Sequence, residues 1–212
     1  MTRIKICGVT QVDDAIGAVA AGADFIGLNF WPRSKRHITP DDAVAVAAAI
    51  RGAGTTQIAG VFVDASIDDI AMIVRKVDLD IVQLHGDESA ETVAKVAVRT
   101  GKPVWKAAPA RRDAQLDYPG ADVILLDTPS VDRGGTGRTF DWTIAADAIR
   151  NHPNLQLMLA GGLSPENVAA AISAVRPWGV DVASGVESAP GVKDLGRIVA
   201  FAAAVRAAGM AQ

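Results

Sequence analysis

The sequence predicts an α/β protein folded as a single (β/α)8 TIM barrel that spans residues 1–212. Short β-branched runs alternate with alanine-rich helical stretches from one end of the chain to the other, and no change in composition marks a linker. Strands that alternate with helices pair in parallel through right-handed crossovers. Eight such units of about 26 residues each fit a closed barrel near the short end of its size range. A doubly wound open sheet is the structural alternative that the same pattern allows.

The expected elements follow from where the apolar runs begin and end. Strands are predicted at residues 3–7, 24–30, 57–64, 81–85, 103–108, 122–127, 155–160 and 179–184. Helices are predicted at about 11–21, 40–51, 67–77, 88–99, 111–117, 141–150, 165–175 and 193–208. Several helix starts carry a hydroxyl residue that can cap the first turn, namely Thr10, Thr39, Ser66 and Ser164.

Composition and charge exclude several classes of protein. Hydrophobic residues make up 50% of the chain, which is enough to bury a sizeable core. A net charge of −3 argues against nucleic acid and anionic membranes as partners. Cys7 is the only cysteine, so no internal disulfide can form and a reducing cytoplasm is the expected location. No secretory signal or membrane-spanning run is recognisable, so we expect a soluble domain.

The first predicted strand, RIKIC at residues 3–7, indicates which side chains point into the barrel. Side chains alternate between the two faces of a strand, so the isoleucines share one face while the cation and the thiol share the other. Barrel strands pack their outer face on helices, so the apolar set should point outward. The same alternation predicts Lys5, Cys7, Gln83, His85, Leu125 and Asp127 in the lumen, with Ile4, Ile6, Val82, Leu84, Ile124 and Leu126 outside.

Polar residues close three of the predicted strands, at Cys7, His85 and Asp127. Barrel enzymes build their sites at the carboxyl ends of the strands, so these side chains are candidates for catalysis. A carboxyl group in that position suits a general acid, although a single aspartate there is also typical of a helix cap. A lone cysteine is often only a small core residue, and His85 fits either a catalytic or a hydrogen-bonded structural role.

One cation and three glycine-rich stretches suggest how a ligand could be bound. Arg36, in SKRHI, could hold a carboxylate in a bidentate fork, or it could be a solvated loop cation. The glycine-rich stretches follow the predicted strands six, seven and eight, at residues 134–137, 160–164 and 181–187. Glycine lets backbone amides approach an anion, and the loops after strands seven and eight are the common phosphate site of this barrel. The pattern therefore predicts a phosphorylated small molecule as the ligand.

Six stretches, taken together, resemble the phosphoribosylanthranilate isomerases of tryptophan biosynthesis. They are KICGVT, SKRHI, QLHGDE, LLDT with GGTGRTFDW, LAGGLSPENV, and GVDVASGVE with PGVKD, and they run in order from residue 3 to about 194. A double glycine is common to many phosphate-binding barrels, but its combination with a cysteine that ends the first strand is specific. The resemblance implies an Amadori rearrangement, in which N-(5'-phosphoribosyl)anthranilate becomes 1-(2-carboxyphenylamino)-1-deoxyribulose 5-phosphate without a metal or an organic cofactor.

The resemblance also implies a role for each candidate residue. Asp127 would be the general acid that opens the ribose ring, and Cys7 the general base that removes a proton from the adjacent sugar carbon. Arg36 would bind the anthranilate carboxylate. The other substrate contacts would be His85, Asp181 and the phosphate-binding residues Gly135, Gly161, Gly162, Ser184 and Gly185. Because a free thiol is a weak base at neutral pH, Lys5 could supply a positive field for the thiolate, or it could be a structural lumen residue.

Two other functions stay open at this stage. The first is the histidine-pathway aldose–ketose isomerase, or a barrel that accepts both substrates; those enzymes resemble two fused half-barrels with paired aspartates. Here the loop after strand three follows VFVD without a double glycine, and strand one ends in Cys7. The second is a phosphate-binding barrel without catalysis, which has no use for a cysteine and an aspartate that face each other. A monomer and a homodimer both fit the sequence.

Overall fold

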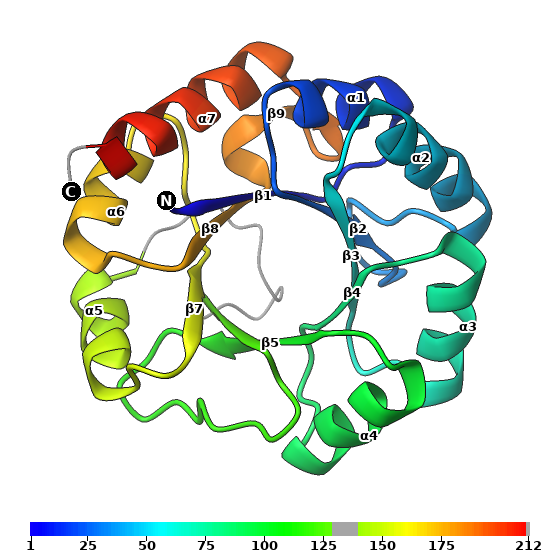
Figure 1. The fold of residues 1–212 in the computed structure, drawn as a ribbon, viewed down its shortest axis with the longest axis horizontal. Coiled ribbons are helices and arrows are strands. Elements are labelled where there is room, and N and C mark those ends of the chain that lie inside the picture. The colour runs from blue at the N-terminus through cyan, green and yellow to red at the C-terminus, as the bar shows by residue number, and fades with distance from the viewer. Residues whose placement is uncertain (129–139, 211–212) are drawn as a thin grey trace.

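The computed structural model describes residues 1–128 and 140–210, and it contains the predicted closed barrel of parallel strands (Figure 1). Each strand pairs with the next along the chain, and β8 closes the ring on β1, so the open-sheet alternative is wrong. The strands are β1 (Arg3–Cys7), β2 (Phe25–Asn29), β3 (Gln57–Phe62), β4 (Ile81–Leu84), β5 (Val104–Pro109), β6 (Val123–Asp127), β7 (Gln156–Leu159) and β8 (Gly179–Val182).

Helices surround this barrel on the outside (Figure 1). The described part of the chain contains α1 (Val12–Ala20), α2 (Pro40–Ala53), α3 (Ile67–Val77), α4 (Ala90–Thr100), α5 (Trp142–Asn151), α6 (Val168–Val175) and α7 (Leu195–Met210). After β8, the one-turn helix η1 (Ser184–Val186) leads into a small hairpin of β9 (Glu187–Ala189) and β10 (Val192–Lys193), which the sequence pattern did not predict. Among the described residues, none of the helices has the length and apolar character needed to cross a membrane.

The helix predicted at residues 111–117 is wrong, because the chain between β5 and β6 runs through irregular turns. The spacing of its apolar residues gives the reason. Ala114, Leu116 and Tyr118 recur at every second residue, whereas a helix that packs on a barrel needs apolar residues three or four positions apart. Leu116 and Tyr118 still pack on the apolar layer, so this segment covers its part of the barrel without a helix.

The predicted helix caps are right at two of four positions. Thr39 and Ser66 accept hydrogen bonds from backbone amides in the first turns of α2 and α3. Thr10 does not cap α1, because its hydroxyl donates to a loop carbonyl instead. Ser164 does not cap α6. Its backbone amide donates to Asn167 Oδ1 in a turn, and α6 begins only after that turn, at Val168.

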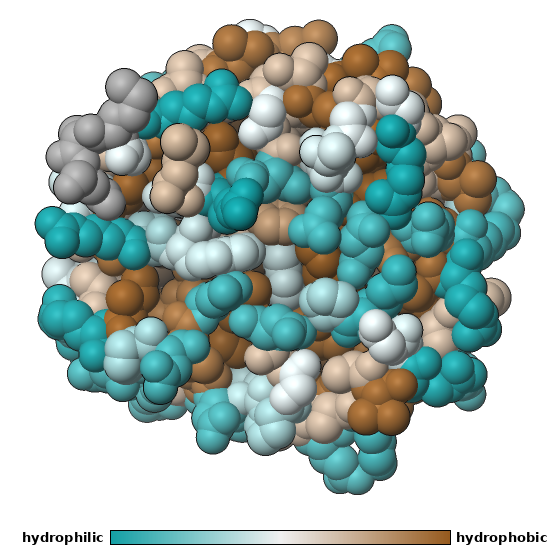
Figure 2. Space-filling model, viewed as in Figure 1, coloured by the Kyte–Doolittle hydropathy of each residue, from teal (hydrophilic) through white to brown (hydrophobic). Residues whose placement is uncertain are grey.

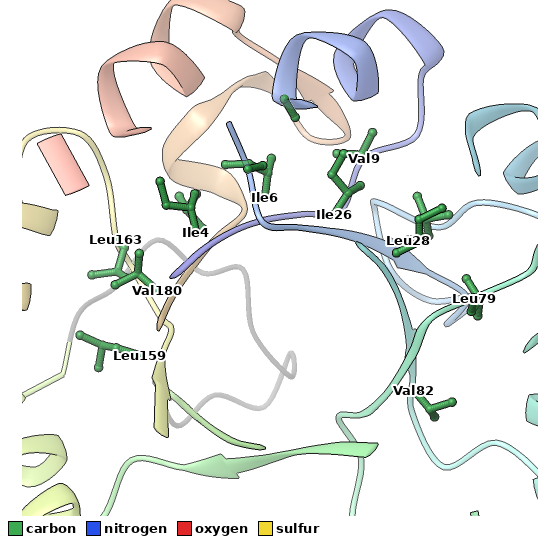
Figure 3. Close-up of a cluster of buried hydrophobic side chains, with 14 of the residues drawn as sticks. Ile4, Ile6, Val9, Ile26, Leu28, Leu79, Val82, Leu159, Leu163 and Val180 are labelled. Carbon is green, nitrogen blue, oxygen red and sulfur yellow. The ribbon is translucent and has the colours of Figure 1, made fainter. Parts of the chain in front are cut away.

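Two apolar layers lie on the two faces of the barrel strands, as the alternation predicts. The outer layer packs against the helices, and Figure 3 shows part of it around Ile4, Ile6, Val82 and Val180. The second cluster, inside the lumen, consists of Phe25, Ala59, Ile81, Trp105, Ala107, Val123, Leu125, Met158 and Ala160. Several of these are the first residues of their strands, so the amino-terminal half of the lumen is a packed core.

Hydrophilic residues are spread over the face of the barrel seen in Figure 2, with hydrophobic residues between them.

Candidate active site

The two predicted catalytic residues lie at the carboxyl ends of their strands. Cys7 is the last residue of β1, and Asp127 is the last residue of β6. His85 follows the last residue of β4, and Asp181 lies within β8. Closure of the barrel brings these strand ends, which are far apart in the sequence, around one lumen.

Cys7 lies in a tight environment formed by β1 and β2. It is paired in register with Gly27 of β2, and a Cβ placed on Gly27 would lie 2.7 Å from Cys7 Sγ. The same atom would lie 3.2 Å from Lys5 Nζ. A glycine at this position therefore leaves the space that the thiol and the ammonium group occupy.

The ammonium group of Lys5 is held by a carboxylate rather than left free. Lys5 and Asp181 face each other in the register of β1 and β8, and Lys5 Nζ lies 2.9 Å from Asp181 Oδ1. The Lys5 side chain is 0% exposed and that of Asp181 is 9% exposed. Burial lowers the pKa of Lys5, but Asp181 and Cys7 raise it, and the net shift is upward. Lys5 is therefore a charged member of a buried ion pair.

The environment of Cys7 favours the protonated form of its thiol. Burial raises the pKa of the Cys7 thiol, and the nearby positive charge of Lys5 offsets only part of that effect. Asp181 also raises this pKa, because its negative charge opposes the thiolate. The positive field that the sequence suggested is present, yet desolvation outweighs it.

Asp127 is bound on both of its carboxylate oxygens. Oδ1 accepts a hydrogen bond of 2.7 Å from the Thr128 amide, and Oδ2 lies 3.2 Å from His85 Nε2. On the other side of the imidazole, Gln83 Nε2 lies 3.0 Å from His85 Nδ1. With the Gln83 amide nitrogen as donor, Nδ1 accepts and Nε2 carries the proton that points to Asp127. The structure thus brings together the predicted acid and His85, with Gln83 behind them.

Arg36 is paired with a carboxylate that the sequence reasoning missed. Its Nε and Nη2 atoms donate to the two oxygens of Glu187 in β9, both at 2.7 Å. The bonds to Glu187 raise the pKa of Arg36. Burial alone would raise the pKa of Glu187, but Arg36 and Lys193 outweigh it, so this pKa lies below its ordinary value. Arg36 is therefore a largely buried, ion-paired cation and not a solvated one.

Lys193, at the end of β10, is the second residue that the sequence reasoning missed. Its Nζ donates to the Cys7 carbonyl at 2.6 Å, to the Ala183 carbonyl at 3.2 Å and to Glu187 Oε1 at 2.8 Å. Burial lowers the pKa of Lys193, while the Glu187 carboxylate opposes that shift. Both missed residues stand inside stretches that carried the family resemblance, and the available signal was a charged residue directly after a Gly-Val pair.

The predicted phosphate-binding residues after β7 and β8 lie next to one another. A Cβ on Gly185 would lie 1.9 Å from the Leu163 carbonyl oxygen, so these two loops are in direct contact. Gly161 has a φ of +84°, and a Cβ there would lie 2.8 Å from Asp127 Oδ1. Gly162 and Ser184 complete this group of predicted residues, whereas Gly135 lies outside the described residues. In the described ranges, no cluster of three or more His, Cys, Asp or Glu side chains is arranged to hold a metal ion.

Comparisons with known proteins agree with this architecture. The sequence model described as PRAI, N-(5'phosphoribosyl)anthranilate (PRA) isomerase, matches residues 4–204. A curated N-(5'-phosphoribosyl)anthranilate isomerase from Ralstonia pickettii is 43% identical over 220 residues, which cover 98% of this chain and 94% of the relative. One from Myxococcus xanthus is 43% identical over 207 residues, which cover 96% of each chain.

Solved structures lead to the same family. A phosphoribosyl anthranilate isomerase from Thermotoga maritima superposes with a TM-score of 0.87 at 39% identity, covering 98% of this chain and 100% of the other. A phosphoribosyl anthranilate isomerase in complex with reduced 1-(o-carboxyphenylamino)-1-deoxyribulose 5-phosphate has a TM-score of 0.83 at 38% identity, with the same coverage. With a family match over nearly its whole length and a barrel of the same architecture, this chain belongs to the N-(5'-phosphoribosyl)anthranilate isomerase family.

Proposed function

We propose that this protein isomerises N-(5'-phosphoribosyl)anthranilate to 1-(2-carboxyphenylamino)-1-deoxyribulose 5-phosphate, with Cys7 as base and Asp127 as acid. The observation that carries the proposal is the placement of a thiol and a carboxyl group at two strand ends of one lumen. The reaction moves hydrogen within one molecule, so it needs an acid and a base but no external oxidant or reductant. Acid–base groups of this kind contribute about 10²–10⁴-fold each to a rate.

In the first step, protonated Asp127 gives its proton to the ring oxygen of the ribose. The bond between that oxygen and C1 breaks, the anthranilate nitrogen supplies the electron pair, and a protonated Schiff base forms. His85 supports this step because its Nε2 lies 3.2 Å from Oδ2 of Asp127, and a hydrogen bond donated there stabilises the carboxylate that remains after the proton has left. His85 was also expected to contact substrate, and that contact stays a prediction.

In the second step, the Cys7 thiolate removes the proton from C2 of the Schiff base. The electron pair of the C–H bond moves to neutralise the iminium nitrogen, which leaves an enolamine. Protonation at C1 and loss of the proton from the C2 hydroxyl then give the ketone. Burial raises the pKa of Cys7 and so opposes formation of this thiolate, whereas the positive charge of Lys5 favours it.

The ligand contacts in this proposal divide into two ends of the substrate. The guanidinium of Arg36 binds the anthranilate carboxylate, because a planar fork matches a carboxylate. The phosphate is bound by the contacting loops after β7 and β8, through Gly161, Gly162, Ser184 and Gly185, together with Gly135. Asp181 accepts from Lys5 Nζ through Oδ1, which leaves Oδ2 for its proposed contact with the substrate.

Location and assembly are part of the same proposal. A free thiol as catalytic base functions in a reducing compartment, so we assign the protein to the cytoplasm. One relative is described as a dimeric enzyme from Thermotoga maritima. For this chain, a monomer and a homodimer both stay predictions, and nucleic acid and membranes are not proposed as partners.

Turnover tests the proposal. The fluorescence of the anthranilate group falls as phosphoribosylanthranilate is converted, so the rate of that loss with purified protein measures the activity directly. The histidine-pathway aminoaldose is assayed in parallel, because a barrel that accepts both substrates would turn over each of them. Binding of the reduced product without turnover of either aminoaldose would contradict catalysis and favour a phosphate-binding barrel.

A further inference from the structure

Three charged side chains from three segments form one buried cluster beside Cys7. Arg36 comes from the loop after β2, Glu187 from β9 and Lys193 from β10. Their side chains are 13%, 5% and 0% exposed, respectively. One carboxylate thus lies between two cations and accepts hydrogen bonds from both, so Glu187 is the only member that joins the other two.

Glu187 occupies only one edge of the Arg36 guanidinium. It accepts from Nε and from one hydrogen of Nη2, which leaves the edge formed by Nη1 and the second hydrogen of Nη2. A guanidinium has five N–H groups, so a second carboxylate can bind this free edge while Glu187 stays in place. The stem of Arg36 lies over Gly8, where a Cβ would be 2.4 Å from Arg36 Cδ, directly after Cys7 in the chain.

The other half of the cluster reaches the backbone of the predicted base. Lys193 has three N–H groups, and all three are used, on the Cys7 carbonyl, the Ala183 carbonyl and Glu187. Ala183 precedes the loop proposed to bind phosphate, and Cys7 ends β1. Removal of the Glu187 charge would leave two buried cations facing each other, and both would lose the partner that fixes them.

We propose that Glu187 is a positioning residue of the isomerase site. It holds the guanidinium of Arg36 so that the free edge faces the anthranilate carboxylate, and it anchors Lys193 against the end of β1. Glu187 itself does not touch the substrate. This inference rests on the proposed function, because it needs Arg36 to bind the carboxylate of the substrate.

The test compares two ligands on four proteins: wild type, Glu187→Gln, Arg36→Met and the double variant. One ligand is reduced 1-(2-carboxyphenylamino)-1-deoxyribulose 5-phosphate, and the other is the same molecule without the carboxylate. Gln has the size of Glu but offers only one acceptor oxygen, so the Arg36 fork loses at least one charged hydrogen bond. We expect Glu187→Gln to weaken binding of the carboxylate ligand at least about tenfold and that of the other ligand less than about threefold.

The double variant distinguishes positioning from a general structural role. If Glu187 acts through Arg36, then Glu187→Gln in the Arg36→Met background weakens carboxylate binding by less than about twofold. Glu187→Gln should likewise raise KM for phosphoribosylanthranilate in the wild-type background but not in the Arg36→Met background, and it should change kcat less than KM. Glu91→Gln, which removes an exposed carboxylate paired with Lys95 on α4, is the matched control and should leave binding and turnover unchanged.

A crystal structure of the wild-type protein with the carboxylate ligand keeps the inference testable even if Glu187→Gln does not fold. We expect Glu187 on the Nε edge of Arg36 and the ligand carboxylate on the other edge. Displacement of Glu187 from Arg36, direct contact of Glu187 with the ligand, or independent effects of the two substitutions would overturn the inference. These results are distinguishable from failure of the proposed function, which would appear as absence of turnover by the wild-type protein.

Discussion

Lys5 and Asp181 form a buried ion pair across the seam where β8 closes on β1, with Lys5 Nζ 2.9 Å from Asp181 Oδ1. The pair lies beside Cys7, and its two charges shift the pKa of the thiol in opposite directions: Lys5 lowers it and Asp181 raises it. It therefore connects the closure of the barrel with the acidity of the proposed base.

Lys5→Met is expected to destabilise the fold and to raise the pKa of Cys7 further. The substitution leaves the Asp181 carboxylate buried without its partner, which costs about 3–5 kcal/mol of unfolding free energy. It also removes the positive charge that favours the thiolate. Denaturant unfolding measures the first effect, and addition of Asp181→Asn should restore part of the lost stability. Lys95→Met on the exposed face of α4 is the control. Wild-type stability in Lys5→Met would show that the pair is not needed to close the barrel.

The thiol of Cys7 should titrate above the ordinary cysteine range in the folded protein. Cys7 is the only cysteine, so the rate of alkylation by iodoacetamide as a function of pH reports on this group alone. Because burial raises the folded pKa above the unfolded one, the folded protein binds this proton more tightly. The associated stability is fully present below the unfolded pKa and is lost as the pH rises through the folded value. If the pH midpoint of alkylation in the folded protein lay below that of the denatured chain, the upward shift of the Cys7 pKa would be wrong.

Arg36→Met should raise KM for phosphoribosylanthranilate more than it changes kcat or stability. The loss of a charged hydrogen bond to the ligand carboxylate corresponds to about 1.5–3 kcal/mol of binding free energy. Steady-state kinetics together with thermal unfolding separates the two effects. An unchanged KM would mean that Arg36 serves only its ion pair with Glu187.

Asp127→Asn should stop ring opening while the site still binds the reduced product. Asparagine retains the size of aspartate but has no proton to give, so we expect turnover to fall by about 10²–10⁴-fold. The wild-type protein should show a bell-shaped dependence of kcat/KM on pH, because acid and base must hold opposite protonation states. If Asp127→Asn stays within a few-fold of wild type from pH 5 to 10 and the bell persists, another group is the acid, with Asp181 and His85 the next candidates.

The sequence was sufficient for the barrel because short apolar strands alternate with helical stretches along the chain, and the first strand shows by its two-residue alternation which side chains face the helices. Ile4 and Ile6 lie in the outer apolar layer, while Lys5 and Cys7 point to the lumen, as the alternation requires. The same kind of alternation explains the failure at residues 111–117. The apolar residues of that segment recur at every second position, whereas an amphipathic helix needs them three or four positions apart.

The charged cluster at Arg36 could not be derived from local pattern. Arg36 and Glu187 are separated by 151 residues, and only closure of the barrel places them together. Glu187 and Lys193 lie in a short hairpin after β8 whose strands are too brief to show a period. The balance of charges around Cys7 was equally hidden, since desolvation depends on packing that sequence spacing does not give.

The most direct test of the account is the rate of Cys7→Ser on phosphoribosylanthranilate, measured with its affinity for the reduced product. Serine keeps the shape of the side chain, but its alkoxide is far harder to form than a thiolate. We predict a fall in turnover of about 10²–10⁴-fold, with an unchanged fold and little change in binding of the reduced product. A Cys7→Ser protein that converts the substrate at close to the wild-type rate would contradict the assignment of Cys7 as the base.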